Sequence, residues 1–212
     1  MHLLTETVPA HRVTYIHQHF KRPDEPGGSR PYEFATRLAS SGWHVTMVCG
    51  GTEDRRYSVA GFDVIQVKSA YRNDMGRLRR IASFLSFSFA SSLRALRTQP
   101  DVIFASSTPL TVAIPGLICK WLLRKPLVFE VRDLWPEVPI RLGYLRNRWL
   151  IRAARRLEHA AYRGSEAVVG LSPQMCEGIR RVHPSASVSL IPNTSQIQTF
   201  AVSAERAKEF RT

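Results

Sequence analysis

The chain has 212 residues, a formal net charge of +13, 44% hydrophobic residues and three cysteines. This length fits one domain that can bury its own core. The uncharged stretch at residues 81–93 contains five serines and is shorter than the ~20 apolar residues of a transmembrane helix, so no membrane span is expected.

The cysteines and the amino terminus indicate the compartment. Cys49, Cys119 and Cys176 are odd in number, lie in predicted strands or helices, and lack the spacing of metal ligands. Residues 1–11 lack the basic start and apolar core of a signal peptide. We therefore expect reduced core thiols, no metal site and a cytoplasmic protein.

The first unit of the chain is predicted to be a strand, a loop, a helix and a second strand. β-branched and aromatic residues predict strands over residues 13–20 and 43–49, and apolar periodicity predicts a helix over residues 29–41 that ends at Gly42. Such a unit directs backbone N–H groups and the positive end of the helix toward the loop, where an anion such as a phosphate is favoured.

The loop of this unit contains a pair of glycines, Gly27 and Gly28. Residues without Cβ allow a diphosphate to approach the backbone, although an ordinary turn explains the pair equally well. The dinucleotide fingerprint is absent, because six residues separate the strand from the first glycine. Arg55 and Arg56 follow the second strand, where NADP enzymes bind phosphate, so an NAD(P) oxidoreductase or a non-catalytic anion-binding module remains an alternative.

The rest of the chain alternates between predicted strands and helices. Strands are predicted at 62–67, 101–105, 128–131, 167–171 and 188–191, and helices at 76–98, 110–123, 147–163 and 173–181. This alternation predicts parallel pairing, and therefore an α/β fold with a Rossmann-like, doubly wound, mostly parallel sheet and helices on both faces.

Residues 128–137 change abruptly from an apolar run to charges and proline. Because α/β enzymes place their chemistry at the carboxyl ends of strands, Arg132 and Asp133 are candidate functional residues. A structural alternative is that Asp133 caps a helix. We expect Glu130 to point away from the face of Asp133 and to pair with Arg132 in the interior of the fold.

Four segments carry a resemblance to a known family: residues 15–20 with the glycine pair, residues 38–48, the run Val-Arg-Asp-Leu-Trp-Pro-Glu at 131–137, and Ile-Pro-Asn-Thr at 191–194. With them the chain resembles the amino-terminal half of a family 4 glycosyltransferase of the GT-B fold, of the bacterial polysaccharide and O-antigen type. Thr194 stands where many relatives have glycine, and Trp43 where a small or polar residue is common.

The resemblance implies a domain organisation and a reaction. Family members are roughly twice as long, so we expect residues 1–200 to form the acceptor-side domain, residues 201–212 to begin an interdomain linker, and the donor-binding domain to be absent. The implied reaction transfers sugar, with retention of configuration and without metal or cofactor, from a nucleotide sugar to a growing, lipid-linked cell-surface polysaccharide.

The resemblance also implies roles for particular residues. Asp133 is the expected catalytic residue, orienting or deprotonating an acceptor hydroxyl or stabilising charge on the sugar ring. Expected substrate-binding residues are Gly27, Gly28, His17, His19, Arg132, Ser107 and Asn193. Packing and hydrogen bonding are the alternative for His17 and His19, and metal ligation is not expected because no third ligand is near.

The net charge gathers in two arginine clusters, at residues 72–80 and 141–156. The first precedes the apolar residues Ile81, Phe84, Leu85, Phe87 and Phe89, so the helix could lie in an anionic membrane interface and hold the protein peripherally on the inner face of the cytoplasmic membrane. Alternatively, these phenylalanines belong to the core. We do not expect nucleic-acid binding, since no base-stacking or helix-turn-helix pattern accompanies the arginines.

Overall fold

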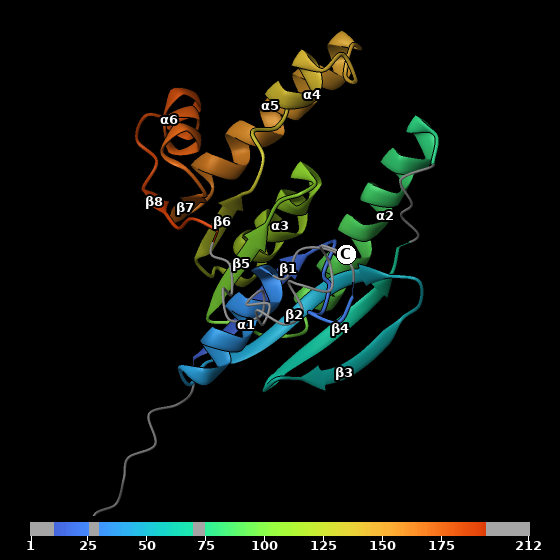
Figure 1. Ribbon diagram of the computed structural model, residues 1–212, viewed down its shortest axis with the longest axis vertical. Coiled ribbons are helices and arrows are strands. Elements are labelled where there is room, and N and C mark those ends of the chain that lie inside the picture. Colours follow the sequence, from blue (N-terminus) through green and yellow to red (C-terminus); the bar gives the residue numbers. More distant parts are fainter. Residues whose placement is uncertain (1–10, 26–29, 70–74, 194–212) are drawn as a thin grey trace, which may run out of the picture.

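The computed structural model describes residues 11–25, 30–69 and 75–193, except for the side chains of residues 77 and 78, and is built around an eight-stranded sheet (Figure 1). The strand order is β3-β4-β2-β1-β5-β6-β7-β8. Every pairing is parallel except that of β3 with β4, which is antiparallel. The predicted Rossmann-like, mostly parallel sheet is therefore confirmed.

The strands are three to eight residues long. They are β1 (Arg12–His17), β2 (His44–Gly51), β3 (Arg55–Val59), β4 (Phe62–Lys68), β5 (Val102–Ser106), β6 (Leu127–Val131), β7 (Ala167–Gly170) and β8 (Val188–Leu190).

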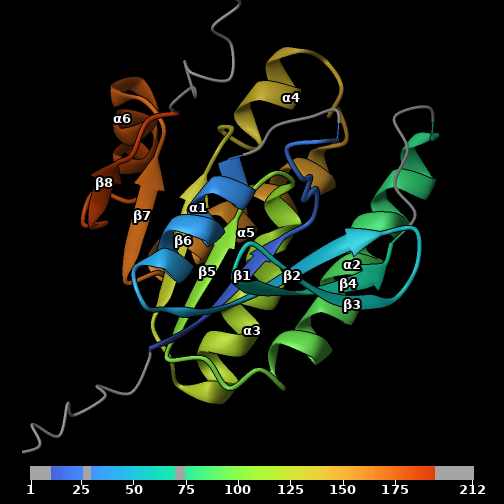
Figure 2. The same ribbon diagram turned by 60° about the horizontal axis from the view of Figure 1, so that its bottom comes forward.

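Helices cover both faces of the sheet unequally (Figure 2). They are α1 (Arg30–Ser40), α2 (Arg77–Ala95), α3 (Ala113–Leu123, preceded by the 3-10 turn η1, Leu110–Val112), α4 (Glu137–Arg141), α5 (Arg148–Arg163) and α6 (Pro173–Val182). Helix α1 packs on β2 and β4, whereas α2 and α3 pack on the opposite face and α5 packs against α3.

Alternate residues of the central strands supply two separate cores. Tyr15 and Met47 belong to the cluster beneath α1, while their neighbours Ile16 and Val48 belong to the larger cluster beneath α2 and α3. Because successive strand residues point to opposite faces, both sides of β1 and β2 are apolar, which accounts for their continuous hydrophobic runs.

The expected exit of α1 at Gly42 is confirmed, and a side-chain cap begins α5. Gly42 follows α1 with φ +87°, a left-handed conformation that glycine adopts without a steric penalty. The Asn147 side chain caps α5, because its Oδ1 accepts hydrogen bonds from the backbone N–H groups of Trp149 and Leu150 at 2.9 and 3.2 Å.

Two elements differ from the sequence-based expectation. Arg55 and Arg56 lie in the antiparallel edge strand β3, with the guanidinium of Arg55 5.3 Å from the Tyr57 ring centre, so they do not form a phosphate loop after β2. The short helix α4 was not expected either, because its sequence contains Pro139 and spans little more than one turn.

The apolar side chains of α2 that were expected to face a membrane lie on different sides of the helix. Phe87 is fully buried in the core and Phe84 is half-buried, so these two phenylalanines do not form an exposed interfacial face. Among the described side chains of α2, the large apolar ones that are exposed are Ile81, Leu85, Phe89 and Leu93, which recur every four residues. Among the described residues, no helix is long and apolar enough to cross a membrane.

The three cysteines are buried and free. Burial raises the pKa of Cys49 and of Cys119 to about 12, so both remain thiols at neutral pH. Within the described part of the chain, no cluster of three or more His, Cys, Asp or Glu side chains could hold a metal ion.

The packing of α5 buries a carboxyl group. Glu158 lies on the inner side of the helix, where its Oε1 accepts a hydrogen bond from the Tyr162 hydroxyl at 3.2 Å. Burial raises the pKa of Glu158 from 4.5 to about 7. The folded protein therefore binds this proton more tightly than the unfolded chain does.

This shift predicts a pH-dependent effect of Glu158→Gln. The contribution of Glu158 to stability is fully present below about pH 4.5 and is lost as the pH rises through about 7. Glutamine keeps an acceptor for Tyr162 but cannot ionise, so we expect the variant to gain up to about 3 kcal/mol above pH 7 and little near pH 5. Thermal unfolding across this range measures the effect, and parallel pH profiles for the two proteins would contradict it.

Candidate functional site

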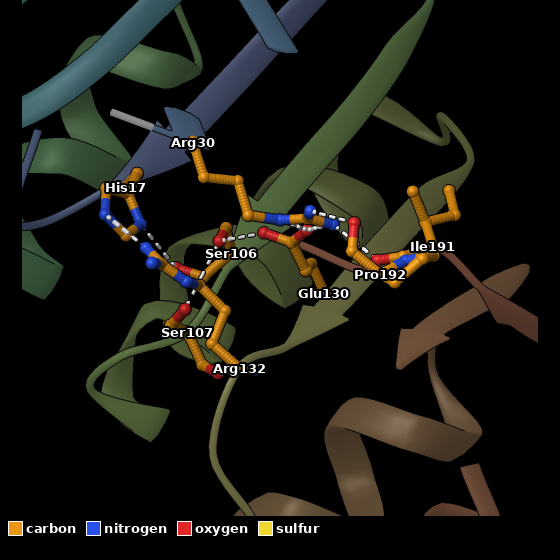
Figure 3. Close-up of polar contacts among 8 residues, drawn as sticks. All are labelled: His17, Arg30, Ser106, Ser107, Glu130, Arg132, Ile191 and Pro192. Carbon is orange, nitrogen blue, oxygen red and sulfur yellow. Dashed lines mark hydrogen bonds and ion pairs between the residues drawn. The ribbon is translucent and has the colours of Figure 1, made fainter. Parts of the chain in front are cut away.

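Polar side chains converge at the carboxyl edge of the sheet, where the strand order changes direction. From the adjacent strands β1 and β5 the chain proceeds outward to β2 on one side and to β6 on the other. Open α/β sheets bind ligands at such a switch point. The residues drawn in Figure 3 come from β1, β5, β6, the start of α1 and the segment after β8.

The centre of this edge is an ion pair between Glu130 of β6 and Arg30 of α1. Glu130 is fully buried, its Oε1 accepts a hydrogen bond from Nε of Arg30 at 2.9 Å, and the same oxygen lies 2.8 Å from Nη2 of Arg30 in an ion pair. Its other carboxylate oxygen accepts a hydrogen bond from the hydroxyl of Ser106. A buried carboxylate requires such partners, because its charge is costly to remove from water.

Arg30 also holds the chain beyond β8. Its Nη2 donates to the carbonyl oxygen of Ile191, and its Nη1 donates to that of Pro192, each at 2.8 Å. The planar guanidinium thus contacts a carboxylate on one side and two carbonyls on the other, as its forked set of donors allows. Asn193, the next residue, is exposed.

The expected pairing of Glu130 with Arg132 is therefore wrong. Arg132 lies beyond the end of β6, and its side chain is directed toward β1, where Nη1 lies 3.3 Å from Nε2 of His17. The partner of Glu130 is instead an arginine one hundred residues away in sequence.

His17 is neutral, and its two contacts fix its tautomer. Nδ1 lies 3.1 Å from the carbonyl oxygen of Ser106 and must donate to it, so Nε2 carries no proton and accepts from Arg132. Burial first, and then the charge of Arg132, lower the pKa of His17 to about 3. The pKa of His19 is lowered by the same two causes.

Asp133 lies next to the loop that follows β5. The hydroxyl of Thr108 donates to its carboxylate at 2.6 Å, and the backbone N–H of Arg132 donates to the Ser107 hydroxyl at 3.0 Å. The Asp133 side chain is exposed and does not cap α4, whose N-cap residue is Pro136. An exposed carboxylate at a strand end can orient a substrate hydroxyl or take its proton.

The structure brings together several of the residues expected from the sequence. His17 and Ser107 both contact Arg132, Asp133 is the next residue in the chain and contacts Thr108, and Asn193 follows the Pro192 carbonyl that Arg30 binds. Gly27 and Gly28 lie outside the described residues.

Sequence reasoning missed Arg30 and the role of Ser106. One signal was available: a glutamate within an apolar strand needs a buried cationic partner, and Arg30 follows directly after the glycine loop.

Comparison with known protein families identifies the kind of domain. Residues 27–194 match the family model of the glycosyl transferase 4-like domain. No curated protein matches the chain.

Several solved structures share the fold. Sucrose-phosphate synthase from Thermosynechococcus elongatus aligns with a TM-score of 0.71 at 17% identity, covering 95% of this chain and 53% of that protein. Anabaena HepE in complex with UDP and glucose gives 0.59 at 18% identity, covering 95% and 49%. A glycosyltransferase from Rickettsia africae gives 0.56 at 10% identity, covering 95% and 48%.

The chain thus spans about half the length of these structural relatives. At such low identity the structural likeness shows a shared fold, whereas the family match covers most of the sequence. The chain belongs to the glycosyl transferase 4-like domain family and has the Rossmann-like fold of one half of a GT-B glycosyltransferase.

Proposed function

We propose that this chain is the acceptor-side half of a retaining glycosyltransferase that moves sugar from a nucleotide sugar to a lipid-linked cell-surface polysaccharide. The observation that carries the proposal is the exposed Asp133 carboxylate beside Arg132, at the switch point of a glycosyl transferase 4-like domain. The proposed location is the inner face of the cytoplasmic membrane, where a lipid-linked acceptor and cytoplasmic donors meet.

The nucleotide-sugar donor is supported by the structural relatives. HepE structures hold UDP-glucose, or UDP and glucose, in proteins about twice as long as this chain. We assign the donor site to a second domain of the whole protein and the acceptor site to the carboxyl edge described above. No metal or cofactor is part of the proposal.

The residues of this edge have different roles in the proposed reaction. Asp133, held by the Thr108 hydroxyl, faces the acceptor hydroxyl and orients it or takes its proton. Arg132 contacts a neutral histidine, so its positive charge is available to a phosphate or to negative charge that develops in the transition state. Nothing at the edge strand β3 favours the oxidoreductase alternative.

The substitution Asp133→Asn tests whether Asp133 acts in catalysis or only stabilises the structure. In the protein that contains this domain together with a donor-binding domain, we expect kcat to fall ~100-fold or more, because the variant keeps the side-chain shape and removes the charge. The melting temperature should stay unchanged, because the amide oxygen of the substituted side chain can still accept a hydrogen bond from Thr108.

A matched control is available at the far edge of the sheet. Asp63 accepts a hydrogen bond from the Ser58 hydroxyl at 2.6 Å, so Asp63→Asn makes the same chemical change away from the site. We expect it to leave kcat within about twofold. Equal rates for the two variants would contradict a catalytic role for Asp133.

The chain by itself is expected to bind nucleotide sugars weakly and to transfer no sugar. Transfer in the proposed enzyme takes place between two domains, and one side of that cleft cannot exclude water or orient a donor. Calorimetric titration with UDP-glucose and an assay for released UDP measure both properties. Sugar transfer by the 212 residues alone would contradict the assignment of the donor site to a second domain.

A further inference from the structure

Large apolar side chains are exposed where α4 meets α5. Leu142, Tyr144 and Trp149 are each more than 60% exposed, and Val138 and Leu150 are also exposed. We call residues 138–150 the α4–α5 junction. A leucine, a tyrosine and a tryptophan this exposed within one short stretch of chain are unusual on a protein that contacts only water.

The same region carries a concentrated positive charge. Residues 137–163 contain seven arginines and two acidic residues, which leaves a net charge of +5. Of the two acids, Glu137 is paired with Arg141 at 2.8 Å and Glu158 is buried. Arg148, Arg152, Arg155 and Arg156 line one shallow surface hollow of about 620 Å³.

The aromatic and cationic groups are intermixed. The guanidinium groups of Arg148 and Arg152 lie 5.2 and 5.1 Å from the Trp149 ring centre, within cation–π distance. An indole flanked by arginines places an apolar ring and two phosphate-binding groups at the same depth, which suits the boundary between phospholipid headgroups and acyl chains.

The junction lies beside the candidate site. Helix α4 begins four residues after Asp133, and helices that alternate with parallel strands have their first turns at the carboxyl edge of the sheet. In Figures 1 and 2, α4 lies at the top of the molecule, at one end of the fold. A surface bound there would lie close to Asp133.

We propose that the α4–α5 junction docks on a bilayer leaflet that contains anionic phospholipids. Leu142, Tyr144 and Trp149 enter the headgroup region, and the arginines of α5 contact lipid phosphates. This inference deepens the proposed function, from which it takes the membrane location, by identifying the surface that brings the acceptor lipid to the site.

The other exposed surfaces fit such a leaflet less well. The apolar stripe of α2 borders a groove of about 310 Å³ with α3, and no charged residue lines that groove. A nucleic-acid duplex would be bound by the arginines through its phosphates and would leave Trp149 and Leu142 without a role.

Vesicle flotation with the chain, without any sugar donor, tests the proposal and does not depend on glycosyl transfer. Vesicles of phosphatidylglycerol and phosphatidylcholine should carry the protein at low salt, and phosphatidylcholine alone should not. At about 0.5 M salt the binding should weaken strongly, because surface electrostatic attraction is screened.

Two variants separate the apolar from the electrostatic contribution to vesicle affinity. The double variant Leu142→Ser and Trp149→Ser keeps every arginine and is expected to lose about tenfold or more in vesicle affinity. The triple variant Arg148→Gln, Arg152→Gln and Arg155→Gln is expected to lose about 100-fold, since each arginine near an anionic surface contributes about a factor of five.

Matched controls make the outcome specific. Arg55→Gln, Arg56→Gln and Arg97→Gln remove the same charge from exposed positions elsewhere, and Leu85→Ser with Phe89→Ser removes exposed apolar groups from α2. Both controls should bind vesicles within about threefold of the parent chain. Circular dichroism verifies that each variant is folded.

The proposal would be overturned if the parent chain did not bind anionic vesicles, and also by any of three results with the variants. They are unchanged binding by the Leu142 and Trp149 variant, an equal loss in the control that removes distant arginines, and a loss confined to the α2 variant. Binding to a DNA duplex that the serine variant retains, together with no binding of the parent chain to anionic vesicles, would assign the arginines to nucleic acid instead.

Discussion

The arrangement of the carboxyl edge depends on one buried ion pair, Arg30 with Glu130. The carboxylate is fully buried and the Arg30 side chain is only 9% exposed, so bulk water solvates neither charge well. The pair is satisfied by a hydrogen bond and an ion-pair contact between its members, by the Ser106 hydroxyl, and by the carbonyls of Ile191 and Pro192. Such a pair adds little net stability over an apolar replacement, but breaking it leaves an uncompensated charge. It thereby fixes the relative positions of α1, β5, β6 and the segment after β8.

Because Glu130 pairs with Arg30, the two arginines of the edge have different electrostatic roles. Arg30 is neutralised by Glu130 and acts within the protein. Arg132 is held by the unprotonated nitrogen of a histidine whose low pKa keeps it neutral, so its charge is not cancelled there. Ser106 links the two halves, because its hydroxyl binds Glu130 while its carbonyl orients His17. The edge can therefore offer a carboxylate at Asp133 and a cation at Arg132 side by side, which is the combination that the proposed sugar transfer uses.

Properties that depend on short segments could be predicted from the sequence. Apolar runs and periodicity located the core strands and the long helices, and the exit of α1 at Gly42 follows from a single residue. Properties that depend on long-range contacts could not. The partner of Glu130 is one hundred residues away, and Phe87 and Phe89 differ only in which side of α2 meets α3. Strand β3 was not predicted, because its side chains are mostly charged or polar. It lies at an exposed edge of the sheet, where the alternation of hydrophobic and polar residues is weak.

The most direct test of the central role of this pair is a double-mutant cycle on the free energy of unfolding, using Glu130→Gln, Arg30→Gln and the two together. Each single variant leaves one buried polar or charged group without its partner and should cost about 3 kcal/mol or more, whereas the double variant should cost clearly less than the sum. A coupling energy of about 2 kcal/mol or greater is the result that this account predicts. Costs that add to within about 0.5 kcal/mol would show that the two residues act independently, and would contradict it.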